Sequence, residues 1–482
     1  MIRRPTYFLT AANIVAVFLA LCLTETWAGS ANGTREASGG SPGTGITREL
    51  SLDECINTAM ERNHRKPASQ FAVAMAEAQH RQALAGYWPQ VSFRGGYKRM
   101  DEAPNFIFPA SSITVPPGLQ LPIPEQDIKL MDPDSFAASA EARWLLYDGG
   151  MRRGLREQSG GFLEMSKQDS RRTDLELVDS VKRLYYGAVL ARQLHQVGKD
   201  TLARMQATLS LTETMYKEGS GKVMKTDYLD NKVMVESLRS AVALLEKNDE
   251  MAKAALANTM GLSWEETVTP SAKEVPFTPY GGKVENLVGA AYEFNPDWAK
   301  LEAGIRAAEG AVRTAKSGYY PKLAVTGELH KWWNDYDAGI ATNQNKEGWS
   351  VGIGFEIAVF EGFLTRNKVA EARARVDKTK EEQFLLKEGI GLQIKDIFLG
   401  LDAAGKSYEA TLDAVTAARE NRDLNTRAYQ NELVETEKVI RAQLVEALMD
   451  AQHYKTVYDH AALQSQLELV VGTEVLKQLE KL

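Results

Sequence analysis

The sequence predicts an internally duplicated α+β membrane protein, in which four strands per chain form part of a β-barrel that very long helices continue. Three observations support this prediction. Landmark residues recur in the same order in two halves of the chain, each half contains two stretches of alternating apolar and polar residues, and each pair of stretches is followed by a long proline-free helical pattern. Four strands cannot close a membrane barrel, so we expect self-association into a trimer with twelve strands.

The composition excludes several other classes of protein. The 482 residues carry 57 basic and 64 acidic side chains, for a net charge of −7, so no basic surface for nucleic acid is indicated. Two cysteines, Cys22 and Cys55, exclude a disulfide scaffold and a multi-cysteine metal site. The six histidines form no HExxH motif, and neither a Gly-x-Ser-x-Gly elbow nor a Cys-His nucleophile pattern is present. The sequence therefore predicts no enzyme, no metal and no cofactor.

The first 28 residues have the pattern of an export signal. Arg3 and Arg4 precede an apolar run from Ile14 to Leu23, and Ala28 ends a small-residue cleavage site. An uncleaved anchor helix is the alternative, but the run of about ten residues is well short of the roughly 20 needed to cross a bilayer. We expect residues 1–28 to be removed on export and residues 29–49 to form a flexible N-terminal segment.

Comparison of the chain with itself defines two repeats. Gly86–Val91 matches Gly318–Leu323 at an offset of 232, and Leu145–Gly149 matches Ala358–Gly362 at an offset of 213. The order of the landmarks over about 200 residues indicates a duplication. The predicted organisation is a first repeat at 50–262, a connector at 263–281, a second repeat at 282–473 and a C-terminal segment at 474–482.

Each repeat contains two predicted strands, at about 90–100 and 135–147 and at about 322–333 and 348–360. Each stretch is long enough for a tilted bilayer crossing. An antiparallel sheet with one face in a soluble core is the alternative, but seven of the 16 prolines lie between Asp101 and Asp134, and a long connection suits the outside of a barrel. The alternation predicts a charged lumenal face with Arg94, Glu141, Arg143 and Glu356, and a lipid face with Val91, Phe93, Trp144, Trp349, Val351, Ile353 and Phe355.

A very long helical pattern follows each strand pair. Along the first, Leu177, Val181 and Leu184 begin an apolar series with alternating steps of four and three residues, as in a coiled coil. At 1.5 Å per residue, such a helix is about 100 Å long. Each repeat then turns back, so we expect helical hairpins at about 151–260 and 363–471. The expected strand-to-helix junctions are Asp148, Gly149, Glu361 and Gly362, and the expected hairpin tips are Tyr216, Gly219, Gly221, Tyr429 and Glu432.

Several segments together carry a family resemblance. They are Gly86–Gln90, Trp144–Gly150 and the Tyr-x-x-Gly turn that precedes Asp227–Leu229, in addition to the signal and the duplicated plan. In this order they resemble the TolC family of outer-membrane efflux proteins, over nearly the whole mature chain. The resemblance implies a homotrimer in the outer membrane of a Gram-negative bacterium, with a twelve-stranded barrel in contact with lipid and a periplasmic helical tunnel.

The family resemblance also implies a function and partners. It implies an exit duct that docks to a periplasmic adaptor (membrane fusion) protein and an inner-membrane transporter. Small-molecule efflux and type I protein secretion both fit the sequence. A periplasmic or surface-attached coiled-coil scaffold without a pore is the alternative from another class.

The second hairpin turn departs from the family pattern. Asp227 and Asp230 follow the first turn, whereas Lys438 and Arg441 occupy the matching positions after the second. In family members with acids at these positions, the acids line the narrow periplasmic entrance, so the resemblance makes these four residues the candidate entrance. A solvated outer face with no role is the alternative, because charges are common near helix starts.

Overall fold

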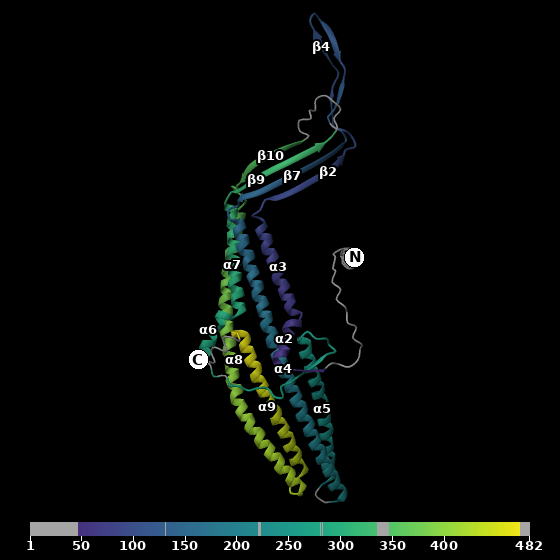
Figure 1. Cartoon of the computed structure of the whole chain (residues 1–482), viewed down its shortest axis with the longest axis vertical. Helices are drawn as coiled ribbons and strands as arrows, with labels where there is room; N and C mark the ends of the chain where they lie inside the picture. The colour runs from purple at the N-terminus through teal and green to yellow at the C-terminus, as the bar shows by residue number, and fades with distance from the viewer. Residues whose placement is uncertain are drawn as a thin grey trace, which may run out of the picture. The chain divides into compact units, whose positions relative to one another are not determined.

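The computed structural model describes residues 47–130, 132–219, 223–279, 281, 283–334 and 347–472. The expected signal segment, most of residues 29–49, Gly221 and the C-terminal segment 474–482 lie outside these ranges. In the described part, a four-stranded sheet connects directly to a bundle of long helices, and a second, narrower β-structure extends from the other end of the sheet (Figure 1).

The sheet is antiparallel with the strand order β10-β9-β7-β2. Its strands are β2 (Gln90–Arg99), β7 (Asp134–Tyr147), β9 (Lys322–Trp333) and β10 (Glu347–Glu356). In the described part of the chain, β2 and β10 are edge strands that each pair with one neighbour. The expected strand at 348–360 ends four residues early, because β9 begins at Lys322, opposite Glu356, and leaves the residues after Glu356 without a partner strand.

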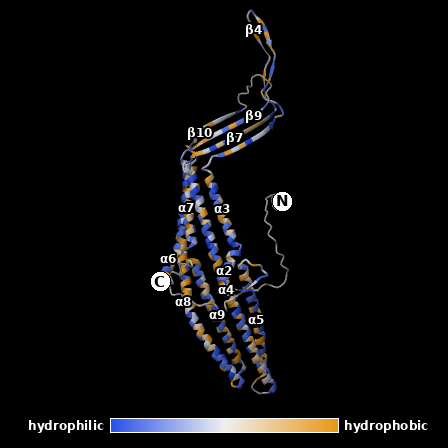
Figure 2. Ribbon diagram, viewed as in Figure 1, coloured by the Kyte–Doolittle hydropathy of each residue, from blue (hydrophilic) through white to orange (hydrophobic). Residues whose placement is uncertain are grey.

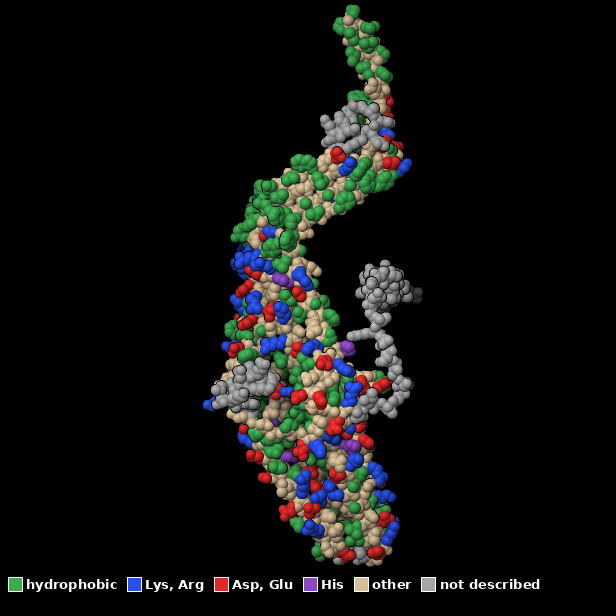
Figure 3. Space-filling model, viewed as in Figure 1, with side chains coloured by type: hydrophobic (Ala, Val, Ile, Leu, Met, Phe, Trp, Pro, Cys, Tyr) green, Lys and Arg blue, Asp and Glu red, His purple; other side chains and the backbone are tan. Residues whose placement is uncertain are grey.

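The strand register gives the sheet one apolar face and one polar face. Val91, Ala142, Gly327 and Val351 lie opposite one another in a row across the four strands, and alternate residues along each strand share their face. All seven residues expected to face lipid lie on this side. Hydrophobic and hydrophilic residues alternate along the strands of the sheet (Figure 2), and apolar side chains gather over it (Figure 3). The opposite side carries the four expected charges, which are Arg94, Glu141, Arg143 and Glu356.

The long connection between β2 and β7 contains strands that the sequence pattern did not predict. Two small antiparallel sheets form there. β3 (Asn105–Phe108) pairs with β6 (Gln126–Lys129), and β4 (Ser111–Val115) pairs with β5 (Leu119–Ile123). The prolines lie mostly in the turns or at strand ends, where their missing N–H is tolerated. The connection is therefore a long hairpin.

The end of the expected flexible N-terminal segment is also ordered. β1 (Thr47–Leu50) pairs in parallel with β8 (Thr267–Pro270), which lies within the connector between the repeats. Val268 is fully buried and belongs to a core with Leu177 and Leu256. This pairing holds residues 47–49 in a strand, and both strands lie over the core that contains Val268.

The helices follow the same order in both halves. The first half contains α2 (Leu52–Arg62), α3 (Arg65–Ala85), α4 (Met151–Glu218) and α5 (Lys225–Thr259), of 11, 21, 68 and 35 residues. The second contains α6 (Val284–Phe294), α7 (Pro296–Lys316), α8 (Leu364–Gln430) and α9 (Thr436–Val471), of 11, 21, 67 and 36 residues.

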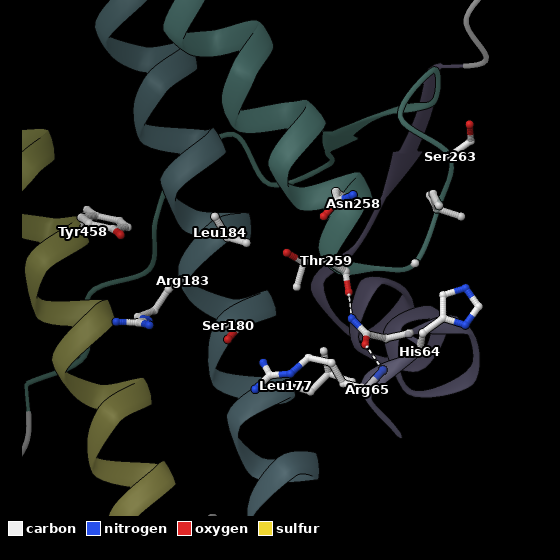
Figure 4. A pocket seen from close by; sticks show the side chains of 13 residues that line it. His64, Arg65, Leu177, Ser180, Arg183, Leu184, Asn258, Thr259, Ser263 and Tyr458 are labelled. Carbon is white, nitrogen blue, oxygen red and sulfur yellow. Dashed lines mark hydrogen bonds between the residues drawn. The ribbon is translucent and has the colours of Figure 1, made fainter. Parts of the chain in front are cut away.

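Matching asparagines make matching contacts in the two halves. The Asn63 Nδ2 donates to the Thr259 carbonyl at the end of α5, over 2.7 Å, and the Asn295 Nδ2 donates to the Val470 carbonyl near the end of α9, over 3.2 Å. The Asn63 Oδ1 also accepts from the Arg65 N–H, and Figure 4 shows both Asn63 bonds as dashed lines beside Thr259 and Arg65. Each side chain thus ties a short helix to the end of a returning one.

Sharp turns join the sheet to the helices. The buried Asp148 carboxylate accepts from the backbone N–H groups of Gly150 and Arg152 and from the Arg152 Nε, and so caps the start of α4. Gly149 has φ +67°, and a Cβ there would lie 2.8 Å from the Ser317 carbonyl oxygen. In the second half Glu361 accepts from the Thr365 hydroxyl, and Gly362 has φ +60°. The expected junction residues therefore lie at the turns.

Candidate functional site at the helical hairpin tips

Both long helices end in a left-handed turn. In the first turn Gly219 has φ +71°, and its N–H bonds to the Tyr216 carbonyl. In the second turn Glu432 takes the corresponding conformation with φ +57°, and the Leu433 N–H bonds to the Ala428 carbonyl over 2.8 Å. A residue with a Cβ pays about 1–2 kcal/mol in this conformation. Glu432 stands where the first tip has Gly219, so the side chain differs, but both turns keep the left-handed conformation.

The four candidate entrance residues have different surroundings. The Asp227 carboxylate accepts from the Met224 N–H over 2.8 Å and so caps α5. Asp230 and Lys438 are exposed, and Arg441 pairs with Glu437 one turn earlier on the same helix. Among the described residues, no ion pair joins either aspartate to either cation.

A cleft of about 530 Å³ lies between the two tips. Asp227 and Lys438 both line it, while Asp230 and Arg441 do not. The structure therefore brings one acid and one cation of the candidate set to a common surface. The rest of the lining is largely apolar or acidic, and includes Met215, Val223, Met224, Leu433, Val434 and Glu435.

The two expected tip tyrosines differ. Tyr429 is buried, and its hydroxyl lies 2.8 Å from the Thr212 hydroxyl and 3.0 Å from the Thr436 hydroxyl. The Asn231 Nδ2 donates to the same Thr212 oxygen over 3.2 Å, so this cluster joins α4, α5, α8 and α9. Tyr216, the repeat equivalent of Tyr429, is 39% exposed and stacks on Tyr228 with a centroid distance of 6.3 Å.

A charged cluster lies farther from the tips. The Glu446 carboxylate on α9 is buried between Arg204 of α4, at 3.1 Å, and Arg422 of α8, at 3.0 Å. Burial raises the pKa of the Glu446 carboxyl, although both guanidinium groups act in the opposite direction. Nearby, the Gln443 Nε2 donates to the Thr208 hydroxyl over 3.0 Å. These bonds hold α9 against both long helices.

A second polar cluster, around Asp450 and His453 of α9, contains a histidine. The Asp450 carboxylate accepts from Arg419 over 2.8 Å, and the His453 Nδ1 lies 3.0 Å from the Thr411 hydroxyl. Burial lowers the pKa of the His453 imidazole.

Sequence reasoning missed Glu446, Asp450 and their partners. The default expectation for charges on long helices is a solvated face. The only signal was the spacing of Glu446 and Asp450, which fall four residues apart on one face of α9. Among the described residues, no group of three or more His, Cys, Asp or Glu side chains is placed to hold a metal ion.

The cleft drawn in Figure 4 lies elsewhere, where α2, α3, α4, α5 and α9 meet. It has a volume of about 810 Å³. Its two arginines are already paired, Arg65 with Glu176 at 3.2 Å and Arg183 with Asp179 at 3.1 Å. This neutralised cleft therefore offers no free cation for an anionic ligand.

Comparison with known proteins identifies the family. The model of the outer membrane efflux protein family matches residues 55–262 and 287–473, so the chain belongs to this family. The two ranges correspond to the two halves described above. Among the described residues, no helix is both long and apolar enough to cross a membrane.

Curated relatives match parts of the chain. "Pyoverdine export outer membrane protein OpmQ" of Pseudomonas aeruginosa is 26% identical over 41% of both chains. "Protein CyaE" of Bordetella pertussis is 25% identical over 56% of both chains. The matched segments thus span about half the length of these relatives.

Solved structures match most of the chain. CusC superposes with a TM-score of 0.70 and 17% identity, over 88% of this chain and 92% of that one. VceC of Vibrio cholerae superposes with a TM-score of 0.69 and 15% identity, over 87% and 96%. The fold is therefore that of the TolC-like outer-membrane channels.

Proposed function

We propose that three copies of this chain form an outer-membrane exit duct, which carries substrates from a periplasmic adaptor and an inner-membrane transporter to the outside. The sheet carries this proposal. Among the described residues, it has one apolar and one charged face, the strand at each edge pairs with one neighbour only, and it connects directly to helices of about 100 Å. An open strand edge is not tolerated in lipid, so the sheet requires further strands.

The contact between the two halves supports a specific pairing of strands between neighbouring copies. Inside the chain, β7 of the first half pairs with β9 of the second, and Ala140 lies opposite Leu329. The repeat equivalents of these strands are β10 and β2, which are the two open edges. Shifting both residues by the repeat offsets puts Ile353 of one copy opposite Tyr97 of the next. Three copies joined in this way close a ring of twelve strands.

The helices support the same arrangement. Ala303 and Ala307 of α7 are buried, and a Cβ on Gly161 of α4 would lie 2.7 Å from the Ala307 Cβ. The repeat equivalents of these alanines on α3 are Phe71 and Met75, which are 70% and 65% exposed in the single chain. Exposed large apolar side chains at such positions are explained if α3 packs on α8 of the next copy.

A planar-bilayer measurement tests the duct against the scaffold without a pore. Protein extracted in detergent from the outer-membrane fraction should produce discrete conductance steps, because a closed barrel leaves a water-filled lumen. A scaffold should be found in the soluble fraction and produce no steps.

We infer that the tips form the periplasmic entrance, with Asp227, Asp230, Lys438 and Arg441 near its rim. The cleft shared by Asp227 and Lys438 supports this placement. An exposed pair of opposite charges contributes only about 0.2–1 kcal/mol, so closure at the tips requires several such contacts in the trimer.

Changing Lys438 and Arg441 to glutamate should raise single-channel conductance and shift ion selectivity toward cations, because it replaces attraction at the rim with repulsion between acids. Lys380→Glu and Lys395→Glu, which reverse exposed charges on α8 away from the tip turns, provide the control. Unchanged conductance and selectivity in the Lys438/Arg441 variant would show that these residues do not control the entrance.

The adaptor and the transporter determine which cargo enters the duct. One relative is named for pyoverdine export, which supports an export role, and both efflux and type I secretion use such a duct. Identification of the inner-membrane transporter that copurifies with the cross-linked protein would distinguish these roles. Recovery of no transporter from cross-linked cells would argue against a tripartite system.

A further inference from the structure

The long hairpin between β2 and β7 is uncharged over most of its length. Residues 103–124 contain no Asp, Glu, Lys, Arg or His, although charged residues make up 25% of the chain. This stretch includes β3, β4 and β5 and the tip turn between Val115 and Leu119. A long uncharged segment on an exposed hairpin requires an explanation, because such surfaces associate.

The outer part of the hairpin is amphipathic. Ile113 lies opposite Leu121 and Val115 lies opposite Leu119, so all four share one face of the β4–β5 pair. They are 39–63% exposed in the single chain. The other face carries polar side chains and a proline, which are Ser112, Thr114, Gln120 and Pro122. An isolated pair of strands is marginally stable in water, so its apolar face needs a covering surface.

The base of the hairpin is fixed to the sheet. The buried Asn334 side chain follows β9, and its Nδ2 donates to the carbonyls of Asp132 and Asp134 over 3.1 and 2.9 Å. Its Oδ1 accepts from the Asp132 N–H over 2.9 Å. The base of the hairpin is therefore anchored to β9 as well as to β2 and β7.

Charged residues separate the hairpin from the lipid face. Arg99 pairs with Asp134 at 3.5 Å and Lys331 pairs with Glu347 at 3.0 Å, at the end of the sheet from which the hairpin extends. Lys129 also pairs with Asp132 at the base. Such a belt belongs at the water interface of the barrel, and the apolar side chains of the hairpin lie beyond it (Figure 3). Bilayer hydrocarbon is therefore not the covering surface.

We propose that in the trimer the apolar faces of the three β4–β5 pairs pack against one another above the outer mouth of the barrel and form a cap, which narrows the exit of the duct without sealing it. This inference rests on the trimer proposed above. Identical residues meet around a three-fold axis, so any charge there would face its own sign. The absence of charge over residues 103–124 fits this contact better than contact with a foreign protein. Anchoring on one rim also keeps the three hairpins at high effective concentration.

Two neighbouring cysteine substitutions test the cap in intact cells. Leu121→Cys places a thiol on the apolar face, and Gln120→Cys places one on the polar face of the same strand. The native Cys55 is buried, so it does not compete for reagent. We expect a membrane-impermeant maleimide to label Leu121→Cys at least about tenfold more slowly than Gln120→Cys, since packing protects it. Under a mild oxidant, only Leu121→Cys should form disulfide-linked pairs of chains.

The outcomes separate the cap from the duct. Equal labelling of the two thiols in a protein that remains trimeric in detergent would overturn the cap and leave the proposed duct intact. A protected Leu121→Cys that forms no disulfide would also overturn it, because another partner would then cover the face. A monomer in detergent would overturn both the cap and the duct.

Discussion

Buried charge is the most distinctive feature at the residue scale. Glu446 joins Arg204 and Arg422 where three helices meet, and the hydroxyl of Tyr429 joins two threonines nearer the tips. A buried ion pair contributes little net stability compared with apolar packing, but the loss of one partner is costly. These contacts therefore set how α4, α8 and α9 are aligned.

Substitution of Glu446 by alanine should destabilise the helical part by about 3 kcal/mol, because it leaves two partly buried guanidinium groups without their carboxylate. The change should appear as a lower unfolding midpoint of the detergent-solubilised protein. Glu437→Ala is the matched control, since it removes a carboxylate from an exposed pair on the same helix. Equal midpoints for both variants would contradict a stabilising role for the cluster.

His460 makes stability depend on pH. It is 1% exposed, it packs against Phe277 with a centroid distance of 4.5 Å, and neither ring nitrogen has a hydrogen-bond partner among the described residues. Burial lowers the pKa of this imidazole. The unfolded chain then binds more protons than the folded one below the ordinary histidine pKa, so stability falls as pH decreases from about 6.5 toward the lowered value.

The unfolding midpoint should therefore drop between pH 7.5 and 5.5, and His460→Phe should remove part of this drop. His64→Gln, which changes an exposed histidine, is the control. An identical pH profile in the wild type and in His460→Phe would refute the assignment.

At the scale of elements, the sequence predicted the periodic parts well. The alternation along β2, β7, β9 and β10 placed all the expected lipid-facing and charged residues on opposite faces, because the period of a strand is fixed by its backbone. Helix lengths also followed from the proline-free pattern. The β3–β6 hairpin was missed, since its prolines favoured a loop and its strands are only four or five residues long.

The sheet faces can be tested with a pair of lysine substitutions on β10. Val351→Lys places a charge on the apolar face and should destabilise the membrane-inserted protein by about 2–4 kcal/mol near mid-bilayer. Ser350→Lys places the same charge on the opposite face, beside Glu328, and should be tolerated. The amount of heat-resistant oligomer in outer-membrane fractions reports the difference. Equal loss in both variants would mean that the two faces are not lipid and lumen.

The candidate entrance could be predicted only in part. The repeat offset identified the tips and paired Tyr216 with Tyr429, but it could not distinguish the buried tyrosine from the exposed one. That difference depends on which helices pack together, and packing between distant segments leaves no periodic signal. Asp227 was expected at a rim and is also found to cap α5, through a bond from the Met224 N–H three residues earlier.

In the whole molecule, the pairing of β7 with β9 joins the two halves inside the chain. The equivalent strands β10 and β2 lie at the edges of the described sheet and do not pair with each other. The open strand edges β2 and β10, together with Phe71 and Met75 on α3, mark the surfaces that remain to be covered. Three copies that cover these surfaces would enclose a continuous lumen.

Electron cryomicroscopy of the detergent-solubilised protein can show whether such a lumen exists. We predict a three-fold particle in which β10 of each copy lies beside β2 of the next, with one lumen running through the sheet and the helices. A single chain, or an assembly whose sheets do not close around a lumen, would show that this chain does not form the proposed duct.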